Sequence, residues 1–135
     1  MFKADLLEPG SFDSSIKGCS IVFHTASPFL FKFNNPQTEF LEPALGGTKN
    51  ILKAVNSTAS VEKVVLTSSC TAIYGDAVEI SLAPNNIISE DVWNTTSTVL
   101  HQPYSYSKTL AEREAWKMCE EQNRWSLVVI NPSLV

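Results

Sequence analysis

The segment "PYSYSK" (residues 103–108) gathers two tyrosines, two serines and one lysine, groups that can move or polarise protons. On a helix, residues four positions apart lie on one face. Lys108 follows Tyr104 by four positions, whereas Tyr106 is only two positions away and faces elsewhere. We therefore predict that Tyr104 and Lys108 act as a pair. The ammonium favours the phenolate and lowers a tyrosine pKa from its usual value of about 10.

A second segment, "VVLTSSC" (residues 64–70), is an apolar run that ends in hydroxyl side chains. A strand and the helix that follows it adjoin in an α/β fold, so a serine at this strand end can meet Tyr104. Ser68 and Ser69 are the two candidates, and alternation along a strand places them on opposite faces. Hydroxyl, phenol and ammonium together suit polarisation and protonation of a carbonyl oxygen, which indicates carbonyl reduction by a hydride donor.

Three short segments rich in β-branched residues have the character of strands that are buried on both faces of a parallel sheet. They are "SIVFHTAS" (20–27), "VEKVVLTSSC" (61–70) and "RWSLVVINPS" (124–133). Each ends in small polar residues. Because ligands bind beyond the carboxyl ends of parallel strands, these residues are predicted to line a ligand site.

Helical patterns lie between the strands. Residues 38–55 place Leu41, Leu45, Thr48, Leu52 and Val55 on one stripe. Pro43 is expected in the first turn or at a kink. Ser11 is predicted to cap a short helix that Gly18 ends, and Pro103 to open a helix that reaches about residue 122. Residues 76–102 have the composition of an irregular excursion.

Composition narrows the function classes. The chain has 135 residues, a net charge of −4 and 44% hydrophobic residues, which fits one globular domain or part of one. No basic stripe indicates nucleic acid, and no apolar run is long enough to span a membrane. Three dispersed cysteines fit a reducing compartment, so we expect a cytoplasmic protein. Neither histidine stands at metal-site spacing from a cysteine, so no metal is predicted.

"VVLTSSC…YG", "PYSYSK" and "VVINPSLV" together resemble the extended short-chain dehydrogenase/reductases of the NAD-dependent epimerase/dehydratase superfamily. "FKADLLEPGSFDSSIKGCSIVFHTASPF" and "PALGGTKNILKA" resemble its branch of dihydroflavonol, cinnamoyl-CoA and methylglyoxal or aldehyde reductases. The resemblance implies an α/β, partial Rossmann-type, doubly wound parallel sheet that comprises strands 3 to 6 of the family fold. Strand 3 is expected at "FKADL".

The resemblance also implies roles for particular residues. Tyr104 matches the general acid, Lys108 the lysine that lowers its pKa and holds the nicotinamide ribose, and Ser69 the hydroxyl that orients a small-molecule carbonyl substrate. The expected contacts with NADP, or with NAD, are made by three further pairs of residues in addition to Tyr104 and Lys108. These pairs are Asp5 and Leu6, Thr25 and Ala26, and Pro132 and Ser133.

The glycine-rich phosphate loop of the family has no match among glycines 10, 18, 46, 47 and 75. We therefore expect residues 1–135 to be a partial dinucleotide-binding domain without strands 1 and 2 and without the C-terminal substrate region. The apolar strand "IVFHTA" is expected at an open sheet edge. Two alternatives stay open: a nucleotide-sugar epimerase or dehydratase of the same superfamily, and a truncated chain without catalytic activity.

Overall fold

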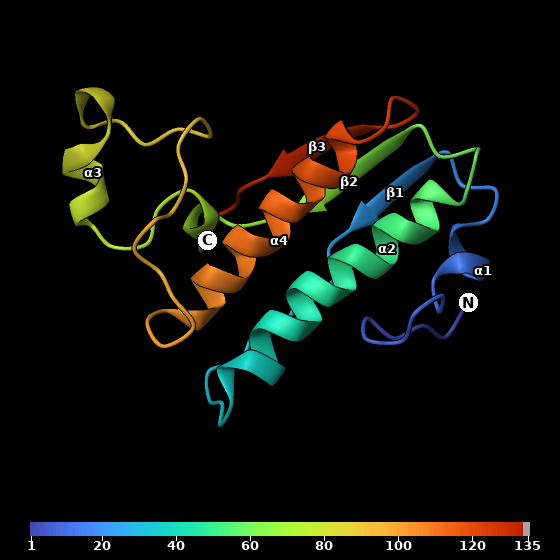
Figure 1. Cartoon of the computed structure of the whole chain (residues 1–135), viewed down its shortest axis with the longest axis horizontal. Coiled ribbons are helices and arrows are strands. Elements are labelled where there is room, and N and C mark those ends of the chain that lie inside the picture. Colours follow the sequence, from blue (N-terminus) through green and yellow to red (C-terminus); the bar gives the residue numbers. More distant parts are fainter. Residues whose placement is uncertain (134–135) are drawn as a thin grey trace.

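A computed structural model describes residues 1–133 of the chain as an α/β fold with one parallel sheet. The sheet contains β1 (Ile21–His24), β2 (Lys63–Thr67) and β3 (Ser126–Ile130) in the order β1-β2-β3. Helices α2 (Gly47–Asn56) and α4 (Pro103–Glu120) lie together over one face of this sheet (Figure 1). The predicted fold class and the edge position of "IVFHTA" are confirmed.

The apolar core lies between the sheet and these two helices. Val22 pairs with Val64, and Val64 with Leu127, so one row of aliphatic side chains crosses the sheet. Val64 and Val55 are fully buried, and Ala115 of α4 joins the same cluster. Burial of each large aliphatic side chain contributes about 1.5–3 kcal/mol, which makes this layer the main source of stability.

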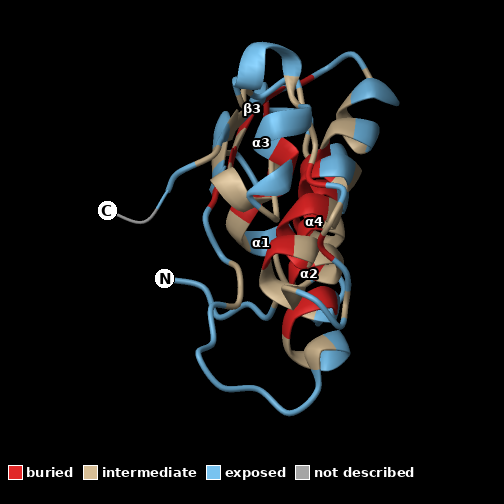
Figure 2. Ribbon diagram, turned by 90° about the vertical axis from the view of Figure 1, so that its left-hand side faces the viewer, coloured by how far each residue is buried: buried red, intermediate tan, exposed pale blue. Residues whose placement is uncertain are grey.

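The prediction that the strands are buried on both faces is wrong. Phe23 is 70% exposed, Ile130 is 51% exposed and Val128 is 43% exposed, and all three point away from the helices. Figure 2 shows the buried residues concentrated on the helix side of the sheet. Apolar runs predict how well a strand suits burial, but burial itself requires a second layer, and residues 1–133 provide one on a single face.

The expected strand at "FKADL" is also not formed, since residues 2–6 lie outside the sheet. In the doubly wound order 3-2-1-4-5-6, strand 3 pairs with strand 2 and not with strand 4. A strand without a neighbour leaves its backbone hydrogen bonds unmade. The sheet of this chain therefore corresponds to strands 4 to 6 of the expected fold.

The first helix, α1 (Asp13–Ile16), begins later than predicted, with Phe12 at the cap position. Ser11 does not cap it, because its Oγ accepts instead from the backbone N–H of Asp5 at 3.1 Å and its hydroxyl donates to the Asp5 carbonyl oxygen at 2.6 Å. Gly18 follows the helix with φ = 81°, a left-handed conformation that favours glycine.

The helix predicted over 38–55 has two parts. Its first part, η1 (Gln37–Gly46), has the wide turns of a π-helix and contains Pro43 well beyond its first turn. It continues directly into α2 (Gly47–Asn56). Wide turns rotate the apolar stripe, so Leu45 is only half-buried whereas Phe40 and Ala44 are buried. Of the predicted stripe, Leu41, Thr48, Leu52 and Val55 are buried, and only Leu45 departs from it.

The long helix α4 is confirmed, with Pro103 in its first turn. Ser107, Ala111 and Ala115 are all buried, so their small side chains allow the helix to approach its neighbours closely. The excursion over residues 76–102 is mostly irregular and contains only two short helical turns, α3 (Val78–Leu82) and η3 (Pro84–Asn86). A further short turn, η2 (Cys70–Ala72), follows β2.

One carboxylate holds this excursion in place. Glu79 accepts hydrogen bonds from the backbone of Gly75 and Thr95 and from the hydroxyls of Thr95 and Thr96. Burial alone would raise the pKa of Glu79, but these hydrogen bonds outweigh burial and lower it. We call Gly75, Glu79, Thr95 and Thr96 the Glu79 cluster. The Glu79 cluster orders residues 76–102, as the apolar core orders the rest of the fold.

Candidate active site

The carboxyl ends of the three strands meet at one edge of the sheet, as parallel pairing requires. Thr25 and Ala26 follow β1, Ser68 and Ser69 follow β2, and Pro132 follows β3 shortly after its end. The backbone of Cys70 donates to the carbonyl oxygen of Pro132 at 3.0 Å, which fixes the second and third strand ends side by side. The expected gathering of polar residues at this edge is confirmed.

Tyr104 lines a pocket of about 400 Å³ at this edge. The pocket is lined by Phe29, Ser68, Ser69, Cys70, Thr71, Tyr74, Tyr104, Pro132 and Ser133. The ring of Phe29 meets that of Tyr104 edge-on, with centroids 5.2 Å apart. Phe40 packs behind Tyr104 at 6.3 Å. The phenol therefore lies in an aromatic setting, on a wall that it shares with both candidate serines.

Ser69 lies where β2 ends and η2 begins, and its oxygen caps that turn. Its Oγ accepts a hydrogen bond from the backbone N–H of Thr71 at 3.2 Å and one from the Thr71 hydroxyl at 3.0 Å. Both lone pairs of Ser69 are thereby engaged, which leaves its own hydrogen to donate. A serine held in this way is suited to donate to an oxygen in the Tyr104 pocket.

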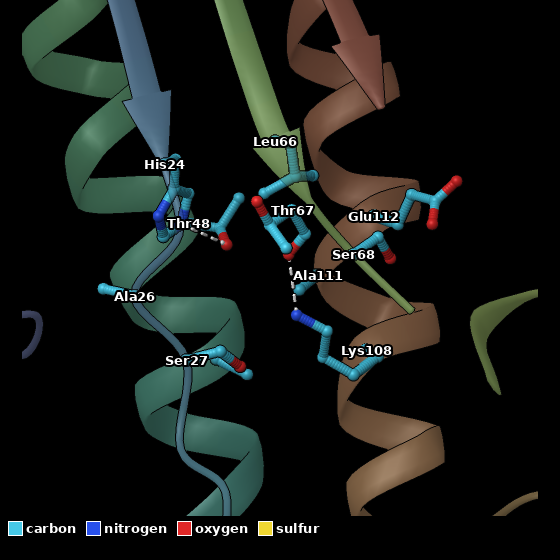
Figure 3. Close-up of a pocket in the computed structure, with 11 residues that line it drawn as sticks. His24, Ala26, Ser27, Thr48, Leu66, Thr67, Ser68, Lys108, Ala111 and Glu112 are labelled. Carbon is cyan, nitrogen blue, oxygen red and sulfur yellow. Dashed lines mark hydrogen bonds between the residues drawn. The ribbon is translucent and has the colours of Figure 1, made fainter. Parts of the chain in front are cut away.

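Lys108 lies one helical turn after Tyr104 but reaches into the protein rather than into the pocket. Its Nζ donates to the carbonyl oxygen of Thr67 at 2.9 Å, and the side chain is buried (Figure 3). Burial lowers the pKa of Lys108 to about 8, although Glu112 nearby acts in the opposite direction. An ammonium in such a setting is available for proton exchange close to neutral pH.

His24, the last residue of β1, faces the same interior region as Lys108 (Figure 3). Its Nε2 lies 3.1 Å from the hydroxyl of Thr48 on α2. Burial, with a further contribution from the charge of Lys108, lowers the pKa of His24 to about 4. The imidazole is therefore neutral at physiological pH and presents one ring nitrogen as donor and the other as acceptor.

The residues expected to contact a dinucleotide are not all gathered in one place. Pro132 and Ser133 line the Tyr104 pocket. Thr25 and Ala26 line a neighbouring depression at the end of β1, and Ala26 also borders the region around Lys108.

Asp5 and Leu6 are not among the residues that line the Tyr104 pocket. Asp5 is exposed, with a carboxylate that accepts from the backbone of Leu7. Leu6 packs against Gly47, and its carbonyl accepts from Asn50 at 2.7 Å.

These positions test whether a nicotinamide dinucleotide fits the chain. The edge formed by Ser69, Tyr104 and Ser133 supplies hydroxyl groups for the nicotinamide end. The glycines supply no cradle for its phosphates: a Cβ at Gly47 would come within 2.7 Å of Leu6, and one at Gly75 within 2.6 Å of Ser97. Gly47 and Gly75 therefore serve internal packing and leave no room for a phosphate, whereas the hydroxyls at the strand ends suit the nicotinamide end of the group.

Several residues near the site were not predicted as site residues, among them Thr71, which holds Ser69, and the three that follow. Phe29 stands beside Tyr104, and His24 stands beside Lys108. Glu112, which accepts from Asn131 at 2.8 Å, ties α4 to the end of β3. Glu112 lies four positions after Lys108, so helical spacing alone could have indicated it. No spacing signal marks Phe29 or His24, because their neighbours on α4 are distant in sequence.

Among residues 1–133, no three His, Cys, Asp or Glu side chains come together as a metal site would need. Nor does any helix in that part of the chain have the length and apolar character to cross a bilayer.

Comparison with known proteins places this geometry in a family. The profile of the NAD dependent epimerase/dehydratase family matches residues 1–135. Cinnamoyl-CoA reductase from Medicago truncatula is 42% identical over 138 residues, and anthocyanidin reductase from Arabidopsis thaliana is 34% identical over 140 residues. Both alignments span 100% of this chain, but only 41% and 40% of those proteins.

Among solved structures, a yeast methylglyoxal/isovaleraldehyde reductase complexed with NADPH superposes with a TM-score of 0.78 at 34% identity. The superposition covers 95% of this chain and 41% of the yeast chain. The chain therefore spans less than half the length of the relatives that it matches.

Proposed function

Because this chain belongs to the NAD dependent epimerase/dehydratase family, we propose that it is the catalytic segment of a longer NADPH-dependent reductase of aldehydes or ketones. The proposal rests mainly on how Ser69 is held in the pocket. Its oxygen accepts two hydrogen bonds from Thr71 while the residue lines the same pocket as Tyr104, so its own hydrogen is free to donate to a carbonyl oxygen bound in that pocket. The matching relatives are reductases, which agrees with this chemistry.

The proposed reaction is carbonyl reduction, for which NADPH, when bound at the strand ends beside Tyr104 and Ser133, would provide the hydride. Ser69 donates a hydrogen bond to the carbonyl oxygen and orients it. Tyr104 donates its phenolic proton to that oxygen as the C–H bond forms, and the product is an alcohol. Lys108 lies one helical turn from Tyr104 and would stabilise the resulting tyrosinate through its positive charge. To hold the ribose as well, its ammonium would have to turn from Thr67 toward the pocket. Phe29 would keep water from one side of the pocket.

A chimera tests these roles in an intact catalytic setting. Residues 1–135 would replace the matching segment of the yeast methylglyoxal/isovaleraldehyde reductase, and NADPH oxidation would be followed with isovaleraldehyde. Tyr104→Phe is expected to reduce the rate by about 100-fold or more, the usual contribution of a positioned general acid. Tyr106→Phe is the matched control, since Tyr106 lies outside the pocket and should leave the rate nearly unchanged. Activity that survives Tyr104→Phe would refute the mechanism.

The same family also contains epimerases and dehydratases, and a tyrosine–lysine pair by itself suits both reactions. The aromatic wall of Phe29 beside Tyr104 favours an apolar carbonyl substrate over a nucleotide sugar, whose hydroxyls require polar partners. A chimera that consumes NADPH stoichiometrically with alcohol formation supports the reductase. A chimera that isomerises a nucleotide sugar without net NADPH loss supports the epimerase.

The isolated chain is expected to bind cofactor poorly, because no glycine-rich loop offers backbone N–H groups to the pyrophosphate. Titration of NADPH into the 135-residue protein should give a dissociation constant weaker than about 1 mM. Micromolar affinity would show that the strand ends suffice without the loop, and would contradict the assignment of this chain as a partial domain.

A further inference from the structure

Three buried polar atoms in one part of the structure have no hydrogen-bond partner among residues 1–133. They are Nδ1 of His24, Oγ of Ser27 and Oγ of Ser68. A buried polar atom without a partner destabilises the folded state, and such atoms are rare in folded proteins. Three such atoms together indicate a bound small molecule that supplies the hydrogen bonds which no protein group supplies.

All three atoms belong to residues that line a single cavity between the ends of β1 and β2 (Figure 3). Lys108 enters this cavity from α4, and Thr48 borders it from α2. The cavity offers about 10 Å³, close to the minimum that the centre of one water molecule requires. It is too small for a substrate or a cofactor group.

Hydrogen-bond accounting identifies what fits. The ammonium of Lys108 has three donors and gives one to Thr67. His24, with Nε2 near Thr48, has Nδ1 left to accept or donate one bond. The hydroxyl of Ser68 can do either. A water molecule has two donors and two acceptors, and therefore suits an ammonium, an imidazole nitrogen and a hydroxyl at once.

We propose that this cavity is an internal water site, in which one water molecule accepts from the Lys108 ammonium and bridges His24 Nδ1 to the hydroxyls of Ser68 and Ser27. The water holds Lys108 from the interior side, and His24 and Ser68 are positioning residues that act through it. This assignment also separates the two adjacent serines. Ser68 borders both the cavity and the Tyr104 pocket, and its hydroxyl is assigned to the water site, whereas Ser69 lines the pocket alone.

The proposal does not depend on the proposed function, because it concerns the folded chain without cofactor or substrate. It can be tested on the 135-residue protein by nuclear magnetic resonance. Transfer of magnetisation from water to the His24 ring, together with oxygen-17 relaxation of the solvent, reports a water molecule that stays bound longer than nanoseconds. We expect both signals in the unmodified protein.

Ser68→Val is the decisive variant, because it removes one partner and fills the cavity with a methyl group. It should abolish the water signal at His24. Ser107→Ala is the matched control: Ser107 is an equally buried serine whose hydroxyl already donates to the Tyr104 carbonyl at 2.7 Å. That variant should retain the signal.

Two results would overturn the proposal. One is the lack of a long-lived water at His24 in the unmodified protein, which needs no variant and so stands even if Ser68→Val does not fold. The other is a water signal that persists in folded Ser68→Val. The nitrogen-15 shift of His24 Nδ1 gives an independent reading, since a hydrogen-bonded ring nitrogen and a free one differ in shift.

Discussion

The Glu79 carboxylate and the Lys108 ammonium are both largely buried, yet their surroundings differ in completeness. Glu79 accepts four hydrogen bonds from three residues of the excursion that follows β2. Within residues 1–133, Lys108 makes one hydrogen bond, to Thr67, and lies beside three polar atoms without partners. Loss of the Glu79 charge would leave its four donors without an acceptor, whereas loss of the Lys108 charge would free only one acceptor. The two clusters can therefore be told apart by what their removal does to stability.

Glu79→Ala should give the largest effect. It leaves two backbone N–H groups and two hydroxyls without their acceptor, and we expect a loss of roughly 3 kcal/mol in the free energy of unfolding. Glu79→Gln keeps one acceptor oxygen and should lose less. Urea denaturation at pH 7 measures both.

The pH dependence gives a second reading of Glu79. Its folded-state pKa lies below the unfolded value, so its stabilisation is complete above the unfolded pKa and is lost as pH falls through the folded one. If Glu79→Ala unfolds at the same urea concentration as the parent, the Glu79 cluster does not hold the excursion.

Gly75→Ala tests the same cluster by packing instead of charge. A Cβ at Gly75 would lie 2.6 Å from the hydroxyl oxygens of Ser97 and Thr96, so these groups must move. We expect a loss of about 2 kcal/mol, in the range for overpacked sites. Gly46→Ala is the control, since its Cβ would find its nearest neighbour, Leu7, at 3.9 Å. Equal stability of the two variants would contradict the tight fit at Gly75.

Lys108→Met should give the smallest change at neutral pH, and in the opposite direction. Replacing a buried charge by an apolar side chain of similar size is often neutral or stabilising, so we expect between no change and a gain of about 1 kcal/mol. Because burial lowers the folded-state pKa of Lys108 to about 8 from 10.5, the unfolded state binds more protons between these values. The stability of the parent should therefore rise from pH 8 to pH 10.5 relative to the variant.

The difference between the two urea-denaturation curves, measured every half pH unit, isolates this contribution from those of other lysines. A flat difference across that interval would show that Lys108 titrates normally. A loss of several kcal/mol in Lys108→Met at pH 7 would show that the ammonium is as structural as Glu79, and the contrast between the clusters would disappear.

Much of the fold follows from local patterns. The apolar runs predicted the three strands, Pro103 predicted the start of the long helix, and Gly18 predicted the turn after the first helix. These signals succeed because they reflect the conformational preferences of the backbone itself. The hydroxyl cap of the first helix failed at Ser11, since its oxygen found a partner in Asp5 across the loop. Local preference is overridden where a tertiary partner is available.

The sequence by itself determined that Tyr104 and Lys108 are one helical turn apart, that hydroxyl residues end the second strand, and that the three strands run in parallel. These are consequences of spacing along a regular chain. Only the tertiary structure decided that Lys108 turns inward to Thr67, that His24 meets it, and that Ser69 rather than Ser68 is braced by Thr71. These contacts depend on which atoms the packed elements bring together and on which hydrogen-bond partners are available at that place. Spacing along the sequence gives no information on either.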